Sequence, residues 1–112
     1  MRIETKRLGR ALVVRCFGEL DLASAAEFRQ VVDAKLAEWE GVRQIVLNLG
    51  QVTFVDSSGL GAILGRYKRI QQREGRMVLV EVPPNLRRLL EFSGIFKLIP
   101  TRASEEEALK LA

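Results

Sequence analysis

The 112-residue sequence contains no histidine and only one cysteine, Cys16. Without histidine, the chain cannot form a Ser-His-Asp or Cys-His nucleophile, an imidazole proton shuttle or most transition-metal sites. A single cysteine excludes an internal disulfide and a zinc site built from cysteines, a pattern typical of a reducing cytoplasm. We therefore expect a cytoplasmic protein that is not a conventional enzyme, with no catalytic residues, no metal and no cofactor.

Long hydrophobic runs are also missing. None approaches the roughly 18 residues that a membrane-spanning helix needs, and residues 1–6 alternate in polarity where a signal peptide has an apolar block. The length suits one hydrophobic core, so we expect a single domain over residues 1–112 and no membrane partner. Cys16 then fits as a small buried hydrophobic residue.

The charge of the chain is modest but unevenly distributed. The formal net charge is +4 at pH 7, and residues 66–76 hold five basic side chains against one acidic side chain. On a helix, Arg66, Arg69 and Arg73 are expected to share an outer face. Such a face more often contacts solvent than phosphate backbones, so we expect no direct nucleic-acid partner. A nucleic-acid accessory role stays open as an alternative.

Hydrophobic periodicity predicts an alternation of strands and helices. Strands are expected at residues 2–7, 11–17, 44–49, 77–82 and 95–99. Helices are expected to start at a capping box over residues 24–27, at the serines after Asp56, at Pro83–Pro84 and at a second capping box over residues 104–107. This order predicts an α/β fold, with a mixed, mainly parallel sheet of about five strands flanked by about four helices.

The least ordinary segment lies between residues 56 and 65. Asp56, Ser57 and Ser58 are all good N-cap residues, and they crowd one helix start. One cap is enough, so at least one serine hydroxyl is expected to be exposed. The first half of the same helix also contains three glycines, each of which costs about 1 kcal/mol against alanine. Glycines remove side chains, so another surface can approach the backbone there.

A helix N-terminus tolerates an added phosphate well, because unpaired backbone N–H groups and the helix dipole stabilise its charge. A phosphoserine carries a charge of about −1.5 to −2, which would repel an acidic partner or clash with a docked one. The plainer interpretation is a double-serine cap with glycines for tight packing. The residues alone leave both interpretations open.

The glycine run also resembles a loosened dinucleotide-binding fingerprint, with Glu81 in the place of the acid that binds a ribose. Against this, the predicted strand ends at Leu49, ten residues before Gly59, and the third glycine is one position late. The chain is also too short for two mononucleotide-binding halves and a substrate domain. A small nucleotide-binding protein that uses this helix start is kept as an alternative.

Residues 52–68, VTFVDSSGLGAILGRYK, resemble the signature of bacterial anti-sigma factor antagonists, which are small STAS domains. The resemblance extends to GELD at 18–21, IVLNL at 45–49 and FSGIFKLI at 92–99, and so spans almost the whole chain. The Ser-Ser pair followed by LGRYK is closest to the sporulation branch, that of stage II sporulation protein AA. General stress-response antagonists more often have Ser-Thr at this point, and an antagonist of that type is the alternative within the family.

The resemblance implies a partner-switching mechanism. In this family the unphosphorylated protein binds an anti-sigma factor that is also a serine kinase, and the sigma factor is released. The kinase phosphorylates the serine after the aspartate, which is Ser57 here, and a PP2C-type phosphatase reverses the modification. The resemblance places the partner-binding surface at Asp21, Ser24, Asp56, Ser58, Gly59, Leu60 and Gly61.

Overall fold

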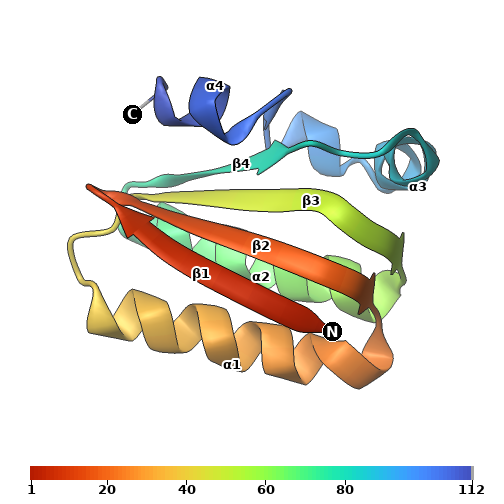
Figure 1. Cartoon of the computed structure of the whole chain (residues 1–112), viewed down its shortest axis with the longest axis horizontal. Helices are drawn as coiled ribbons and strands as arrows, with labels where there is room; N and C mark the ends of the chain where they lie inside the picture. Colours follow the sequence, from red (N-terminus) through yellow and green to blue (C-terminus); the bar gives the residue numbers. More distant parts are fainter. Residues whose placement is uncertain (112) are drawn as a thin grey trace.

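The computed structural model describes residues 1–111 and contains a five-stranded sheet with the order β1-β2-β3-β4-β5 (Figure 1). The strands are β1 (Arg2–Leu8), β2 (Ala11–Leu20), β3 (Gln44–Val55), β4 (Arg76–Val80) and β5 (Thr101–Arg102). β1 is antiparallel to β2, and the other neighbouring strands are parallel. The predicted mixed, mainly parallel sheet is confirmed.

The helices of this part of the chain are α1 (Leu22–Glu38), α2 (Ser57–Gln72), α3 (Pro84–Ser93), α4 (Glu105–Leu109) and the short 3-10 helix η1 (Ile95–Lys97). α1 and α2 cover one face of the sheet, α4 lies on the other, and α3 lies near the end of β3 (Figure 1). None of the helices within residues 1–111 is both long and apolar enough to span a membrane.

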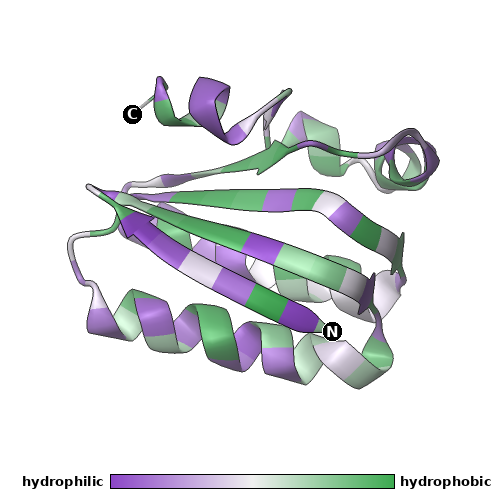
Figure 2. Ribbon diagram, viewed as in Figure 1, coloured by the Kyte–Doolittle hydropathy of each residue, from purple (hydrophilic) through white to green (hydrophobic). Residues whose placement is uncertain are grey.

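Side chains alternate along β2 between the two faces of the sheet, as predicted. Leu12, Val14 and Cys16 join a large apolar cluster with α1, α2 and α3, whereas Val13 joins a smaller one with Ala108 of α4. Figure 2 shows hydrophobic residues over most of β2 and the first half of β3. Burial raises the pKa of the Cys16 thiol to about 12, so this group stays protonated and unreactive.

Helix α1 begins earlier than predicted. Its N-cap is Asp21, whose carboxylate accepts from the Ser24 backbone N–H at 3.1 Å, while the Ser24 hydroxyl accepts from the Asp21 N–H at 3.0 Å. The predicted N-cap at Ser24 is therefore wrong, and Ser24 is the third helical residue of a reciprocal box. Asp21 directly follows β2, so the helix starts as soon as the strand ends.

Strand β3 is longer than its apolar run and continues to Val55. Its second half is buried only at Val52 and Val55, and Gln51, Thr53 and Phe54 are exposed. The β2–β3 register shifts twice, at Arg15/Phe17 and at Gly18/Glu19 in β2. The early predicted end is wrong because this half of the strand still pairs with β2 although it is no longer buried throughout, so no continuous apolar run marks it.

The predicted strand over residues 95–99 is also wrong. Residues Ile95–Lys97 form η1, and the fifth strand follows at Thr101–Arg102. Gly94 ends α3 in the left-handed region at φ 81°, a conformation that glycine adopts readily and that often ends helices. Ile95 and Ile99 are both buried, at a spacing of four residues that suits a helical turn better than a strand.

The basic side of α2 forms only part of the predicted solvated face, because Arg69 is exposed but Arg66 is buried. Arg66 is only 7% exposed, and its Nε lies 3.0 Å from the carboxylate of Asp33 on α1. Arg69 pairs with the same carboxylate at 3.4 Å, and Arg73 donates to the backbone oxygen of Leu36. Burial lowers the pKa of Arg66. The prediction fails for Arg66 because α2 packs against α1 as well as against the sheet.

Candidate functional site

One carboxylate connects the starts of α1 and α2. Asp56 follows β3 directly and caps α2, with Oδ1 accepting from the Gly59 N–H at 2.9 Å. Its Oδ2 accepts from the N–H of Leu22, the first residue of α1, at 3.0 Å. The Asp56 N–H donates to the Leu20 carbonyl of β2 at 3.2 Å. The ends of two strands and the starts of two helices are thus fixed at one point.

Gly59 is required by this close packing. A Cβ at this position would lie 2.1 Å from the carbonyl oxygen of Leu20, far inside contact distance. Gly59 is buried, so the structure gives it a packing role and leaves it no surface for a partner to contact. A Cβ at Gly61 or Gly65 would have no neighbour within 4 Å. Gly61 is exposed, and it leaves the outer backbone of α2 uncovered.

Ser57 is the first residue of α2, and it is exposed. Its neighbour Ser58 is half-buried. Asp56 provides the side-chain cap, so neither serine hydroxyl serves as the N-cap acceptor. The structure therefore presents one serine at the surface of a helix start whose backbone is already fixed.

Asp21 and Ser24 lie beside this helix start, within the capping box of α1. The Ser24 hydroxyl also donates to the Glu19 carbonyl at 2.7 Å. The two residues line a hollow of about 510 Å³ together with Glu19, Glu27 and other residues of β2, β3 and the amino terminus. The lining has mixed charge, because the basic Arg2 lies there with Glu19, Asp21 and Glu27. These residues come from separate segments, so the sequence did not reveal this hollow.

Two large hydrophobic side chains near the site are exposed. Leu22, whose N–H is bound by Asp56, is 76% exposed, and Phe54, two residues before Asp56, is 45% exposed. Leu60 is half-buried and packs against the core. Neither residue was among the predicted contacts, although each lies near a capping aspartate, Leu22 directly after Asp21 and Phe54 two residues before Asp56. These two side chains offer apolar area beside Ser57.

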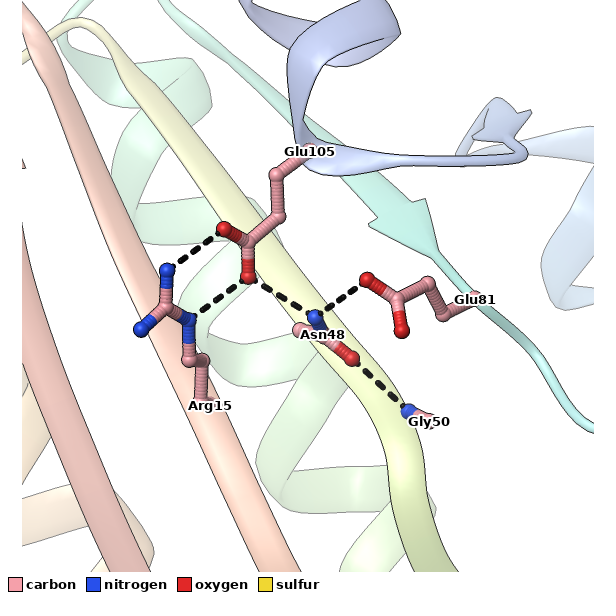
Figure 3. Close-up of polar contacts among 5 residues, drawn as sticks. All are labelled: Arg15, Asn48, Gly50, Glu81 and Glu105. Carbon is pink, nitrogen blue, oxygen red and sulfur yellow. Dashed lines mark hydrogen bonds and ion pairs between the residues drawn. The ribbon is translucent and has the colours of Figure 1, made fainter.

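A separate polar network lies on the opposite face of the sheet (Figure 3). Arg15 of β2 binds Glu105 of α4 through two hydrogen bonds of 2.8 Å. Asn48 of β3 donates to Glu105 at 2.7 Å and to Glu81 at 2.8 Å, and its amide oxygen accepts from the Gly50 N–H. The hydrogen bond from Arg15 lowers the pKa of Glu105, and the same pair raises the pKa of Arg15. This network holds α4 against the sheet.

The geometry does not favour the dinucleotide alternative. Because β3 continues to Val55, the glycine run does follow its strand closely, contrary to the prediction. The Asp56 carboxylate, however, already occupies the start of α2 and would repel a diphosphate. Glu81 is held by Asn48 in the network of Figure 3. The space beside Gly59 is filled by Leu20.

Comparison with known proteins agrees with this architecture. The sequence profile of the STAS domain matches residues 2–108. The anti-sigma F factor antagonist of Paenibacillus polymyxa is 41% identical over 109 residues, covering 97% of this chain and 92% of that protein.

Two solved structures have the same fold over nearly the whole chain. The structure of the anti-sigma factor antagonist SpoIIAA in its unphosphorylated form matches with a TM-score of 0.75 at 28% identity, covering 97% of this chain and 96% of that one. The Bacillus cell fate determinant SpoIIAA in the phosphorylated form matches with a TM-score of 0.75 at 30% identity, covering 97% of each chain. The predicted resemblance is confirmed, and the chain belongs to the STAS domain family.

Proposed function

We propose that this protein is an anti-sigma factor antagonist that works as a phosphorylation switch. Unphosphorylated, it binds an anti-sigma factor with serine kinase activity, and the sigma factor is released. Phosphorylation of Ser57 by that kinase abolishes binding, and a PP2C-type phosphatase restores it. In this proposal the protein is cytoplasmic, and it is a binding module and kinase substrate without an active site of its own. The observation that carries the proposal is the exposed Ser57 on the fixed start of α2.

The surroundings of Ser57 suit a docked protein. Gly61 leaves the helix backbone open, and Leu22 and Phe54 offer exposed apolar area. An interface of this kind combines an apolar centre with a polar rim. The proposed contacts are Asp21, Ser24, Asp56, Ser58, Leu60 and Gly61. Gly59 supports the surface from below, because it is buried against Leu20.

A phosphate on Ser57 would act locally. It adds a charge of about −1.5 to −2 beside the Asp56 carboxylate. The net charge of the chain falls only from +4 to about +2, so the overall field changes little. Burying the phosphate against a partner would instead require desolvating it next to the Asp56 carboxylate. Docking and phosphorylation therefore exclude each other.

The partner is expected to present an apolar patch opposite Leu22 and Phe54. The hollow beside them has mixed charge, since Glu19, Asp21 and Glu27 line it together with Arg2. Likeness to the Paenibacillus polymyxa protein supports an anti-sigma F factor as the partner. The alternative partner is an anti-sigma factor of the general stress response. Titration against one purified anti-sigma factor of each kind separates the two, since the true partner should bind at least about tenfold more tightly.

The site assignment is tested with the cognate anti-sigma kinase and ATP. Intact mass should show one added phosphate, and peptide mapping should place it on Ser57. The Ser57→Ala variant should accept no phosphate, whereas the matched Ser58→Ala variant should be modified at the normal rate. Phosphate located exclusively elsewhere, or equal loss in both variants, would overturn the assignment.

A further inference from the structure

The end of the sheet opposite Ser57 contains an open pocket of about 440 Å³ whose lining is dominated by arginine. Arg10, Arg43, Arg73 and Arg76 line it, together with Glu74 and two uncharged residues. These residues lie where β2, β3 and β4 begin, whereas Ser57 follows the other end of β3. The pocket is therefore separate from the proposed docking surface.

Backbone contacts fix the walls of this pocket. The Arg43 N–H donates to the Arg10 carbonyl at 2.8 Å, and the Arg76 N–H donates to the Arg43 carbonyl at 2.9 Å. Gly75 packs so closely that a Cβ there would lie 2.2 Å from the Arg43 oxygen. Three segments that are distant in sequence are thus tied together, and the arginines converge on a preformed frame.

The positive charge of the pocket is only partly balanced, because Glu74 is the one carboxylate against four arginines among the described residues that line it. Elsewhere Arg15, Arg66 and Arg69 each form an ion pair. Within residues 1–111, by contrast, no carboxylate lies within 4.0 Å of the side-chain nitrogens of the four pocket arginines. Gathering like charges in one concave site raises its electrostatic potential and favours a bound counter-ion.

The hydrogen bonds of these arginines orient them without cancelling their charge. Nη1 of Arg43 donates to the Glu40 carbonyl at 2.6 Å, and Nη1 of Arg73 donates to the Trp39 carbonyl at 3.1 Å. The Arg10 Nε contact with the Gly41 carbonyl is long, at 3.5 Å. Carbonyl oxygens are neutral acceptors, and each guanidinium has five N–H donors, so donors are left to bind an anion.

We propose that this pocket binds a small phosphate-bearing anion. Guanidinium groups are the side chains best matched to phosphate oxygens, because their planar forks donate two hydrogen bonds together. The volume lies within the range of small-molecule sites, which favours an oligophosphate or the phosphate chain of a nucleotide over a flat nucleic-acid surface. This ligand site goes beyond the proposed partner switching and does not depend on it.

The simpler role for the same arginines is to cap the carbonyls at the end of α1. Arg73 and Arg43 serve that role directly. Arg76 forms no side-chain hydrogen bond within residues 1–111, and Arg10 forms only the long one. Substituting Arg10 and Arg76 therefore removes charge from the pocket and leaves the caps of α1 in place.

The test is isothermal titration calorimetry of the full chain with inorganic tripolyphosphate at constant ionic strength. We expect saturable binding at one site, and at least about a tenfold loss of affinity in the Arg10→Gln/Arg76→Gln double variant. The matched control, Arg88→Gln/Arg102→Gln, removes two exposed arginines elsewhere and should bind as the parent does. Absence of saturable binding, or an equal loss in both double variants, would overturn the proposal.

Further arms of the titration separate the sources of the phosphate. Equal affinity for tripolyphosphate and a nucleoside triphosphate supports recognition of the phosphate chain alone. An affinity about tenfold higher for the nucleotide supports a nucleotide ligand at the same arginines. Tighter binding of duplex DNA than of either, with a steep loss on adding salt, would overturn the small-anion site. The Ser57→Ala variant should bind tripolyphosphate as the parent does. A failure of the anion-site proposal can therefore be told apart from a failure of the proposed phosphorylation switch.

Discussion

On one face of the sheet, α1 and α2 pack on a continuous apolar cluster in which Phe28, Leu36 and Ile63 are at most 2% exposed. On the other face, α4 covers a small cluster of valines around Ala108, and beside it lies the Arg15–Glu105 pair. The helix that presents Ser57 therefore lies on the face with more apolar burial. Its start is held by packing, whereas α4 depends more on polar contacts.

The largest stability effect is expected where α2 meets β2. Gly59→Ala places a methyl group against the Leu20 carbonyl and should lower the free energy of unfolding by about 3 kcal/mol, since this overpacking involves backbone. Gly61→Ala, in open space on the same helix, should instead raise it by up to about 1 kcal/mol. Urea denaturation of both variants measures the difference. Equal effects would mean that the start of α2 is not held as described.

A smaller effect is expected between α1 and α2. Asp33→Ala leaves the Arg66 charge buried without its carboxylate, which should lower the free energy of unfolding by about 2 kcal/mol, allowing for the partial exposure of Asp33. Glu38→Ala, which removes the exposed partner of Lys35 on the same helix, should change it by less than about 0.5 kcal/mol. If thermal or urea unfolding gives the same small value for both, the buried pair does not join the helices.

The smallest of these effects is expected on the α4 face. Glu105→Gln should lower the free energy of unfolding by about 1 kcal/mol at pH 7, because it weakens a part-exposed ion pair. The pKa of Glu105 is lowered by folding, so its contribution is present above the unfolded-state pKa and is lost as pH falls through the folded-state value. The difference between parent and variant should therefore vanish in acid. A difference that persists there would contradict the ion-pair explanation.

The sequence predicts the fold well wherever local signals are strong. The caps at Asp56 and Gly94 and the alternation along β2 correspond to contacts within a few residues. The carboxyl end of β3 and the segment after Gly94 were predicted wrongly, because apolar runs do not show which face of an element is covered. The helix start at Ser57 was also predictable, because the capping Asp56 is its neighbour in the sequence.

Features that join distant segments could not be predicted. The burial of Arg66 depends on the position of Asp33 on another helix. The arginine pocket combines residues from positions 10, 43, 73 and 76, and the hollow near Asp21 also combines several segments. No pattern of neighbouring residues in the sequence indicates these contacts. The exposure of Leu22 and Phe54 was not predicted, because hydrophobicity alone does not show whether a residue is buried.

The most direct test of the switch is the affinity of the anti-sigma factor for this protein before and after stoichiometric phosphorylation at Ser57, measured by surface plasmon resonance. Phosphorylation should weaken binding by at least about a hundredfold, since it places a dianion in the docking surface. Ser57→Asp should weaken it in the same direction, while Ser57→Ala should bind as the unmodified protein does and resist the kinase. Unchanged affinity on phosphorylation would contradict the account.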